Sequence, residues 1–228
     1  YGRCHRREVP TFTLHSMFED GSDIVCLSPH ETNEWQPSVD NNGMLVYTRW
    51  DYVDRGFNQA HHPWITYPDG RDPRELNGNT HLSERTAPHL IADVRAIPGS
   101  SKYVAISAGH HTENRGSVIM IDPSVADDGA MSQIKRVTPD QLLSETEYYS
   151  WQNLAKGSGA YATPWPLSET YYLCVYDGDA NAQYGDMEWR QRRYSVTLMD
   201  VFGKKIPLYT HPLISCLSPM PLHARPKP

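Results

Sequence analysis

Cysteine is scarce in this sequence, and no two cysteines are spaced for a shared site. The four are Cys4, Cys26, Cys174 and Cys216, and none forms a CxxC pair. The CxxCH motif for haem attachment is also missing, so we expect no covalent haem in this chain. Cys174 lies in the apolar run YYLCVYD, which is typical of a small buried side chain. One or two disulfides fit the number of cysteines, but the spacing assigns no pairing.

Long apolar runs and concentrated positive charge are missing too. No apolar run approaches the roughly 18 residues of a membrane-spanning helix, so we expect no membrane span. Acidic residues outnumber basic ones, 27 to 21, and the formal net charge is −6. The one dense basic cluster, RQRR at 190–193, is typical of a solvated loop. Nucleic acid is therefore not expected as a partner, because phosphate binding needs a concentrated basic face.

Sequence motifs for nucleophilic or phosphate chemistry are absent. There is no G-x-S-x-G turn, and GSG at 157–159 lacks the Lys-Ser/Thr ending of a phosphate loop. Glycoside hydrolysis by a pair of carboxylates stays open, since the separation of two carboxylates cannot be obtained from the sequence.

The sequence does contain a repeated unit. Four apolar stretches end at an Asp, usually with a Gly close behind, and each is followed by a polar-apolar strand pattern. These stretches are MFEDG (17–21), ITYPDG (65–70), IMIDP (119–123) and LMDVFG (198–203). Asp and Gly favour tight turns, so Asp20, Asp69, Asp122 and Asp200 are predicted to start the turn between two strands.

A second strand precedes three of these turns, and a shorter segment with its own turn precedes that strand. The second strands are MLVYTRW (44–50), KYVAISA (102–108) and YYLCVYD (171–177). Four antiparallel strands per repeat are typical of a β-propeller blade. The sequence therefore predicts an all-β, propeller-type domain over 1–228. The only helix signal is TPDQLLSE (138–145), with Thr138 as N-cap and Pro139 after it.

The repeats amount to about three full blades and parts of others. The expected blade segments are 11–30, 35–80, 92–138 and 160–212, with a partial strand at 213–219. Closed propellers have about four to eight blades. We therefore expect the remaining blades to come from missing sequence, a second chain or another domain, unless the two ends of the chain share a blade.

Several stretches resemble proteins related to the hydrazine synthase alpha subunit, in their middle propeller domain, and more loosely TolB-like propellers. They include NNGMLVYTRWDYVDRG, WITYPDGRDPRELNGN, IPGSSKYVAISAGHH and SPMPLHARPKP, within about residues 30–228. The resemblance implies a six-bladed-type ring, with WD40-like repeats, in a larger exported bacterial protein that is periplasmic or secreted. The neighbouring domain of hydrazine synthase carries c-type haems, but this chain lacks the attachment motif.

Three polar loops follow the second strands: 50–62, 109–116 and 177–193. All three loops occur at the same step of the repeat, directly after the second strand, so they are predicted to lie at one rim of the propeller. The predicted ligand-binding residues are Trp50, Asp51, Asp54, Arg55, Asp177 and Asp179. The predicted metal ligands are His61, His62, His110 and His111. Neighbouring histidines in extended chain face opposite sides, so at most one of each pair is expected to point inward.

Two structural interpretations compete with a ligand site at this rim. In the first, the polar side chains are ordinary solvated loop residues. In the second, Arg49 or Arg55 pairs with Asp51 or Asp54 to order the loop, while Trp50 and Tyr52 pack between blades. Imidazole with carboxylate suits Zn²⁺, whereas carboxylates alone suit Ca²⁺. We expect a binding or scaffold module whose rim holds a metal ion or a small polar ligand. The alternative is an enzyme domain, hydrolytic or redox, that uses a cofactor from another domain.

Overall fold

The computed structural model describes residues 2–4, 7–9, 11–30, 32–51, 60–78, 88–109, 114–126, 132–138, 160–178, 193–222 and 224, the first two ranges by their backbone alone. Within these ranges the regular structure is all strand and turn, which confirms the predicted all-β class. No helix able to cross a membrane occurs in these ranges. The predicted helix at 138–145 lies outside the described residues except for Thr138.

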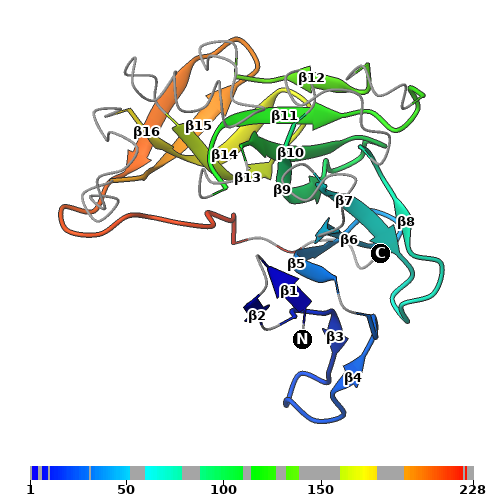
Figure 1. The fold of residues 1–228 in the computed structure, drawn as a ribbon. Helices are drawn as coiled ribbons and strands as arrows, with labels where there is room; N and C mark the ends of the chain where they lie inside the picture. Colours follow the sequence, from blue (N-terminus) through cyan, green and yellow to red (C-terminus); the bar gives the residue numbers. More distant parts are fainter. Residues whose placement is uncertain are drawn as a thin grey trace.

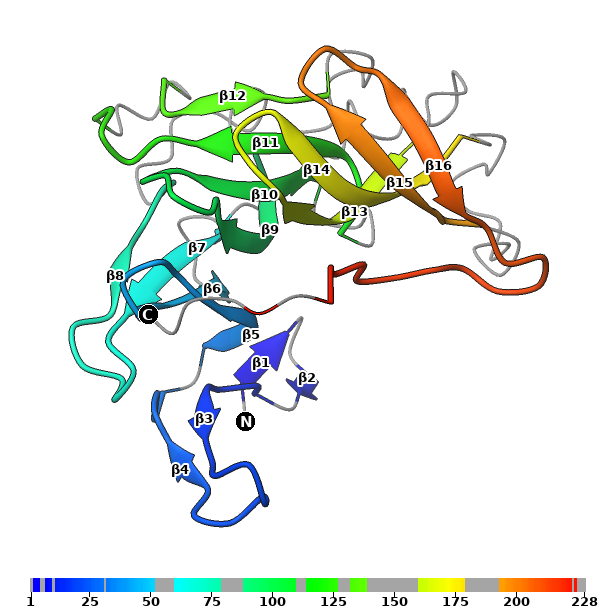
Figure 2. The same ribbon diagram turned by 180° about the vertical axis from the view of Figure 1, so that it is seen from behind.

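Three four-stranded antiparallel blades follow one another along the chain (Figures 1 and 2). The first blade consists of β5 (Asn33–Val39), β6 (Leu45–Trp50), β7 (His61–Thr66) and β8 (Arg74–Glu75). The second consists of β9 (Leu90–Ala96), β10 (Tyr103–Ala108), β11 (Ser117–Ile121) and β12 (Ile134–Arg136). The third consists of β13 (Ala160–Pro166), β14 (Tyr171–Asp177), β15 (Ser195–Asp200) and β16 (Lys205–Tyr209).

Smaller elements precede the three blades. β1 (Gly2–Cys4) pairs with β2 (Arg7–Val9), and β3 (His15–Ser16) pairs with β4 (Val25–Cys26). The β3–β4 hairpin corresponds to the third and fourth strands of a blade, since its turn has the same Asp as the turns of the later blades. The described strands form no closed ring.

The Asp of each repeat makes the turn that was predicted from the sequence. Each carboxylate accepts a hydrogen bond from the backbone N–H two residues further on, and this arrangement recurs in the hairpin and in all three blades. The donor–acceptor pairs are Ser22–Asp20, Arg71–Asp69, Ser124–Asp122 and Phe202–Asp200. Each turn connects the third strand of its blade to the fourth.

Neighbouring blades are joined at the same step of the repeat. The N–H of a first-strand residue donates to a carbonyl shortly before the preceding third strand. Glu34 donates to Phe12, three residues before β3, at 2.7 Å, and Tyr161 donates to Gly116, one residue before β11, at 3.1 Å. Between the first and second blades the equivalent place is the bridge of His61 to Leu90, which merges the two blades into one eight-stranded sheet. We call these contacts the blade links.

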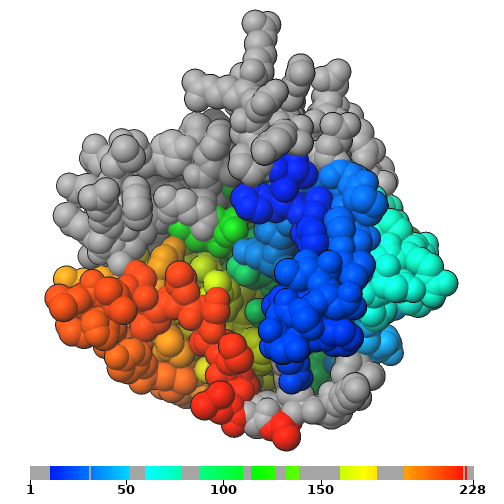
Figure 3. Space-filling view, turned by 90° about the horizontal axis from the view of Figure 1, so that it is seen from below, coloured from blue at the N-terminus to red at the C-terminus, as the bar shows by residue number. Residues whose placement is uncertain are grey.

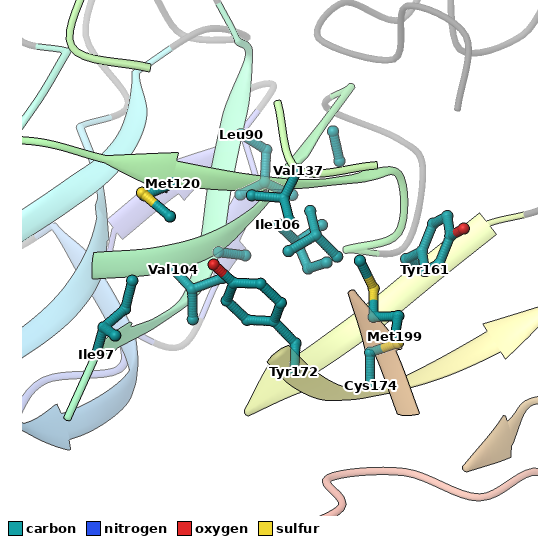
Figure 4. Packing of buried hydrophobic residues seen from close by; sticks show 13 residues of the cluster. Leu90, Ile97, Val104, Ile106, Met120, Val137, Tyr161, Tyr172, Cys174 and Met199 are labelled. Atoms are coloured by element: carbon teal, nitrogen blue, oxygen red, sulfur yellow. The ribbon is translucent and has the colours of Figure 1, made fainter. Parts of the chain in front are cut away.

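The core lies between blades, and the second blade contributes both of its faces. All six residues of β10 are buried, and alternate side chains point to opposite sides of a strand. One cluster joins the first and second blades through Val46, Ile65 and Ala105, among others. The other packs Val104 and Ile106 of the second blade against Tyr172 and Met199 of the third (Figure 4).

Each first strand contains an irregularity in which one residue has a positive φ. The residues are Gln36 (φ 56°), Asp93 (φ 54°) and Thr163 (φ 43°), and the strand register shifts at each of them. Positive φ is unfavourable for residues other than Gly, so three recurrences at one position point to a shared structural role. We call these the bulge residues.

The bulge residues form a chain of hydrogen bonds from blade to blade. The N–H of Asp93 donates to Gln36 Oε1 at 3.1 Å. The N–H of Thr163 donates in turn to the carboxylate of Asp93. The side chains of Gln36 and Asp93 thus each accept a hydrogen bond from the backbone of the next blade, and we call this series the bulge chain.

Candidate functional site

The strand ends between which the three predicted rim loops run lie at one end of the blades. Cross-strand pairs bring the start of the first strand, the end of the second and the start of the third together, as with Asn33, Trp50 and His61. Asp177 lies at the matching end of the third blade, opposite Ala160. The blade links lie at this same end. We keep the name rim for this end of the described blades.

Half of the predicted site residues can be placed at this rim. The described ones are Trp50, Asp51, His61, His62 and Asp177. The other five, Asp54, Arg55, Asp179, His110 and His111, lie outside the described residues.

Trp50 and His61 form a stacked aromatic pair. They are cross-strand partners in β6 and β7, with ring centroids 4.6 Å apart and planes 17° from parallel. Trp35 of β5 meets the Trp50 ring edge-on at 6.2 Å. His61 is only 4% exposed. Its ring is therefore part of a packed aromatic cluster that stiffens this corner of the first blade.

His62 points to the opposite face of β7, as expected for neighbouring strand residues. It is also buried, and its Nε2 lies 3.2 Å from the carbonyl oxygen of Pro88. Its ring packs so closely on Gly78 that a Cβ there would lie 2.8 Å from His62 Cγ. His61 and His62 therefore do not converge. Within the described ranges, no group of three His, Cys, Asp or Glu side chains is arranged to hold a metal ion.

Asp51 is held by an ion pair. Arg49 Nε donates to Asp51 Oδ1 at 2.8 Å, and both side chains are largely buried. The Arg49 guanidinium also lies over the Trp64 ring, 4.2 Å from its centroid. This agrees with the interpretation in which Arg49 orders the start of the loop at residue 51. Asp51 makes this ion pair through one carboxylate oxygen, Oδ1.

A second polar cluster at the rim was not predicted from the sequence. The side chain of Glu34 is fully buried and accepts hydrogen bonds from Ser28 Oγ and from His30 Nε2, the latter at 2.8 Å. Thr32 Oγ1 lies 2.8 Å from His30 Nδ1, and the Thr32 N–H also donates to that nitrogen. His30 Nε2 therefore carries the proton that bonds Glu34.

The chemistry of this cluster has two aspects. It ties the segment after the β3–β4 hairpin to the first blade, and it aligns a hydroxyl, an imidazole and a carboxylate in series. Burial, followed by the charge of Glu34, raises the pKa of Tyr47 well above its usual value. The alternation of His30, Thr32 and Glu34 in HETNE was the available sequence signal.

Asp93 is the one carboxylate among the bulge residues. Burial raises its pKa from 3.8 to about 6, and the opposing effects of Arg95 and of the Thr163 N–H are smaller. The guanidinium of Arg95 lies over the Trp165 ring, 4.5 Å from its centroid. Asp93 is therefore a largely buried acid that titrates near neutral pH.

Comparisons with known proteins relate this chain to solved structures at the level of the fold. No protein-family model matches the chain, and no curated protein matches it. Among solved structures, hydrazine synthase of Kuenenia stuttgartiensis is similar at a TM-score of 0.61 and 14% sequence identity. The alignment covers 88% of this chain but only 23% of that chain. At this identity the similarity shows a related fold, and this chain spans less than a quarter of the length of that protein.

Proposed function

We propose that this chain is a propeller-type binding and scaffold module of a larger exported bacterial protein, with a rim that binds a metal ion or a small polar ligand. The observation that carries the proposal is the recurrence of the blade links, which join the rim ends of successive blades by a backbone hydrogen bond or, between the first and second blades, by a parallel bridge. A rigid platform with loops at one end is the usual arrangement of a binding module. The periplasmic or secreted location rests on the resemblance noted from the sequence.

The proposed ligand site is formed by the loops that connect second and third strands at this rim. Residues 52–59, 110–113 and 179–192 continue from the described strand ends, and they contain Asp54, His110, His111 and Asp179. Their imidazoles and carboxylates suit Zn²⁺, and the carboxylates alone suit Ca²⁺. The buried Asp177 and the ion-paired Asp51 stand where these loops begin.

A metal titration tests the rim. Chelator-treated protein is titrated with Zn²⁺ and separately with Ca²⁺ in a calorimeter, after elemental analysis of the protein as purified. We expect saturable binding of one ion to the unaltered chain and at least about a tenfold weaker affinity in His110→Ala/His111→Ala. His15→Ala, in the β3–β4 hairpin, is the control and should bind like the unaltered chain. Absence of binding, or equal binding by both variants, would contradict the metal-binding part.

One observation favours the alternative of an enzyme domain. Thr32, His30 and Glu34 form a hydroxyl–imidazole–carboxylate series in which the Thr32 hydroxyl is 2.8 Å from His30 Nδ1. Such a series can activate a hydroxyl as a nucleophile in ester hydrolysis. The fold similarity to hydrazine synthase is too distant to favour redox chemistry.

An ester substrate distinguishes this alternative. If the series is catalytic, Thr32→Val removes hydrolysis of p-nitrophenyl acetate, while Thr13→Val, at a half-buried position outside the series, leaves it unchanged. If the series only connects two segments, neither variant changes the background rate, and Thr32→Val lowers the free energy of unfolding by about 1 kcal/mol. We expect the second result.

A further inference from the structure

The sequence contains asparagine followed by glycine at two places, Asn42-Gly43 and Asn77-Gly78. Asparagine is among the chemically labile residues, and a following glycine leaves it open to attack, because glycine has no Cβ to shield its backbone nitrogen. Both glycines have a positive φ, 81° for Gly43 and 94° for Gly78. The two pairs are thus alike in sequence and backbone, and any difference in their reactivity arises from their surroundings.

Asn42 is exposed, in the turn between β5 and β6 at the end of the first blade opposite the rim. The blue part of the chain, which contains this turn, lies at the surface in the view from below (Figure 3). The main-chain N–H of Asn42 donates to Asp40 Oδ1 at 2.8 Å, but its side-chain carboxamide makes no hydrogen bond within the described part of the chain. The carboxamide can therefore rotate toward the following residue.

Asn77 is buried and held in place. It is only 3% exposed, and its Nδ2 donates to Gln133 Oε1 at 2.7 Å. Gln133 is buried as well and lies just before β12, so this hydrogen bond connects the first blade to the second. A reaction of the Asn77 carboxamide therefore requires a local opening that breaks the bond and admits water.

The backbone nitrogen of Gly43, which would attack the Asn42 carboxamide, has the longest hydrogen bond among three neighbouring amides of its turn. Asp40 Oδ1 accepts from the N–H groups of Asn42 at 2.8 Å and Met44 at 2.9 Å. The Gly43 N–H donates to the Asp40 carbonyl oxygen at 3.2 Å, which is at the long end of the usual range. The turn thus holds the amides on either side of Gly43 more closely than that of Gly43 itself.

We propose that Asn42 is a site of spontaneous deamidation, and that the fold protects Asn77 from the same reaction. The Gly43 nitrogen attacks Cγ of Asn42 and forms a C–N bond. The bond from Cγ to the side-chain nitrogen breaks, and this nitrogen leaves as ammonia with the amide proton of Gly43. Water then opens the cyclic succinimide at either carbonyl. The products are aspartate, or isoaspartate in which the main chain passes through the former side chain.

The turn that contains Asn42 also attaches the first blade to the second. Asn41 Nδ2 donates to the carbonyl oxygens of Ile97 at 2.8 Å and Ser100 at 2.9 Å. Isoaspartate lengthens the main chain of the turn by a methylene group directly after Asn41, which displaces that side chain from its acceptors. Deamidation therefore weakens the contact between these blades at the end opposite the rim, independently of any ligand at the rim.

Peptide mapping of the full chain tests the assignment. The protein is incubated at mildly alkaline pH, where circular dichroism establishes that it stays folded, and is then digested. Mass spectrometry follows the conversion of carboxamide to carboxyl at Asn42 and Asn77. We expect conversion at Asn42 to be at least about tenfold faster than at Asn77 in the folded chain. In urea we expect similar rates at the two positions, because the fold no longer protects Asn77.

Asn42→Gln is the matched control, since glutamine keeps the carboxamide but closes a ring much more slowly. After the same incubation, the unaltered chain should show faster hydrogen exchange than this variant at the Asp40 and Met44 amides, which bond across the turn. An unconverted Asn42, or equal rates at Asn42 and Asn77 in the folded chain, would overturn the assignment. Equal exchange in the converted chain and in Asn42→Gln would overturn the structural consequence.

Discussion

At the scale of single residues, the bulge positions are the most unusual feature of the chain. Gln36, Asp93 and Thr163 adopt positive φ values that cost each residue roughly 1 kcal/mol or more. The side chains of Gln36 and Asp93 accept hydrogen bonds from the next blade, and Thr163 Oγ1 accepts one from the Ser218 N–H, which offsets that cost. Asp93 adds a second cost, because its charge is largely buried.

Replacing Asp93 by Asn tests that cost. The folded-state pKa of about 6 lies above the ordinary value of 3.8, so the contribution of Asp93 to stability is complete below about pH 4 and is lost as the pH rises through 6. Asn keeps an acceptor for the Thr163 N–H but carries no charge. We expect Asp93→Asn to raise the unfolding free energy by roughly 1–3 kcal/mol at about pH 8, and to change it little at about pH 4. Urea unfolding at the two pH values measures this.

Two outcomes of this experiment would contradict the prediction for Asp93→Asn. A variant less stable than the unaltered chain at about pH 8 would mean that the Asp93 charge is favourable there. A difference independent of pH would mean that Asp93 does not titrate in this range. In either case burial would not be the dominant influence on this carboxyl.

At the scale of elements, the β3–β4 hairpin depends on one close approach. Gly70, in the turn after β7, has a φ of +82°, and a Cβ there would lie 2.2 Å from the carbonyl oxygen of Leu27. Gly21, in the hairpin's own turn, has the same φ but nothing within 4 Å. A substitution at Gly21 therefore reports backbone strain alone, whereas a substitution at Gly70 reports the same strain together with the contact to Leu27.

Alanine at each glycine makes the comparison quantitative. Gly21→Ala should lower the unfolding free energy by roughly 1 kcal/mol, from the positive φ alone. Gly70→Ala should cost about 1–3 kcal/mol more, because the methyl group displaces the Leu27 backbone. Denaturant unfolding of both variants measures the difference. Equal losses would show that Leu27 is not held against this turn.

The strand repeat and its turns could be predicted from the sequence, whereas the inner details could not. Asp20, Asp69, Asp122 and Asp200 were identified because a turn Asp bonds its own backbone, so its role is local. The bulge residues bond across blades, and their role appears only after the blades are packed. Glu34 was missed because a carboxylate at a strand start is typical of solvent, and its burial depends on His30 and Ser28.

The candidate site was predicted more coarsely than the fold. One rim was deduced because strands at the same step of a repeat end on the same side, and Trp50 and Asp177 do lie at matching ends. The roles of individual side chains were harder. His61 and His62 belong to β7 and pack against Trp50 and Gly78, a result that depends on tertiary neighbours.

At the scale of the whole molecule, the second blade connects the others. Its even-numbered β10 residues, Val104 and Ile106, face the third blade, while Tyr103 and Ala105 face the first. Each blade of a repeat protein is stabilised mainly by its neighbours. Loss of packing in β10 should therefore destabilise all three blades.

Ile106→Ala measures this coupling. Truncating a fully buried Ile should lower the unfolding free energy by roughly 2–5 kcal/mol. Because both core clusters include β10, we expect amide protection to fall together in β6, β10 and β14, as measured by hydrogen exchange. Loss confined to β10 would show instead that the blades unfold separately.

The bulge chain has a single direction. Each bulge side chain accepts a hydrogen bond from a backbone N–H that lies further along the sequence. Such a contact is head-to-tail, unlike the mirrored patches of a two-fold dimer, and units joined this way either come full circle or propagate as an open helical fibre. The Ser218 N–H continues the same direction by donating to Thr163 Oγ1.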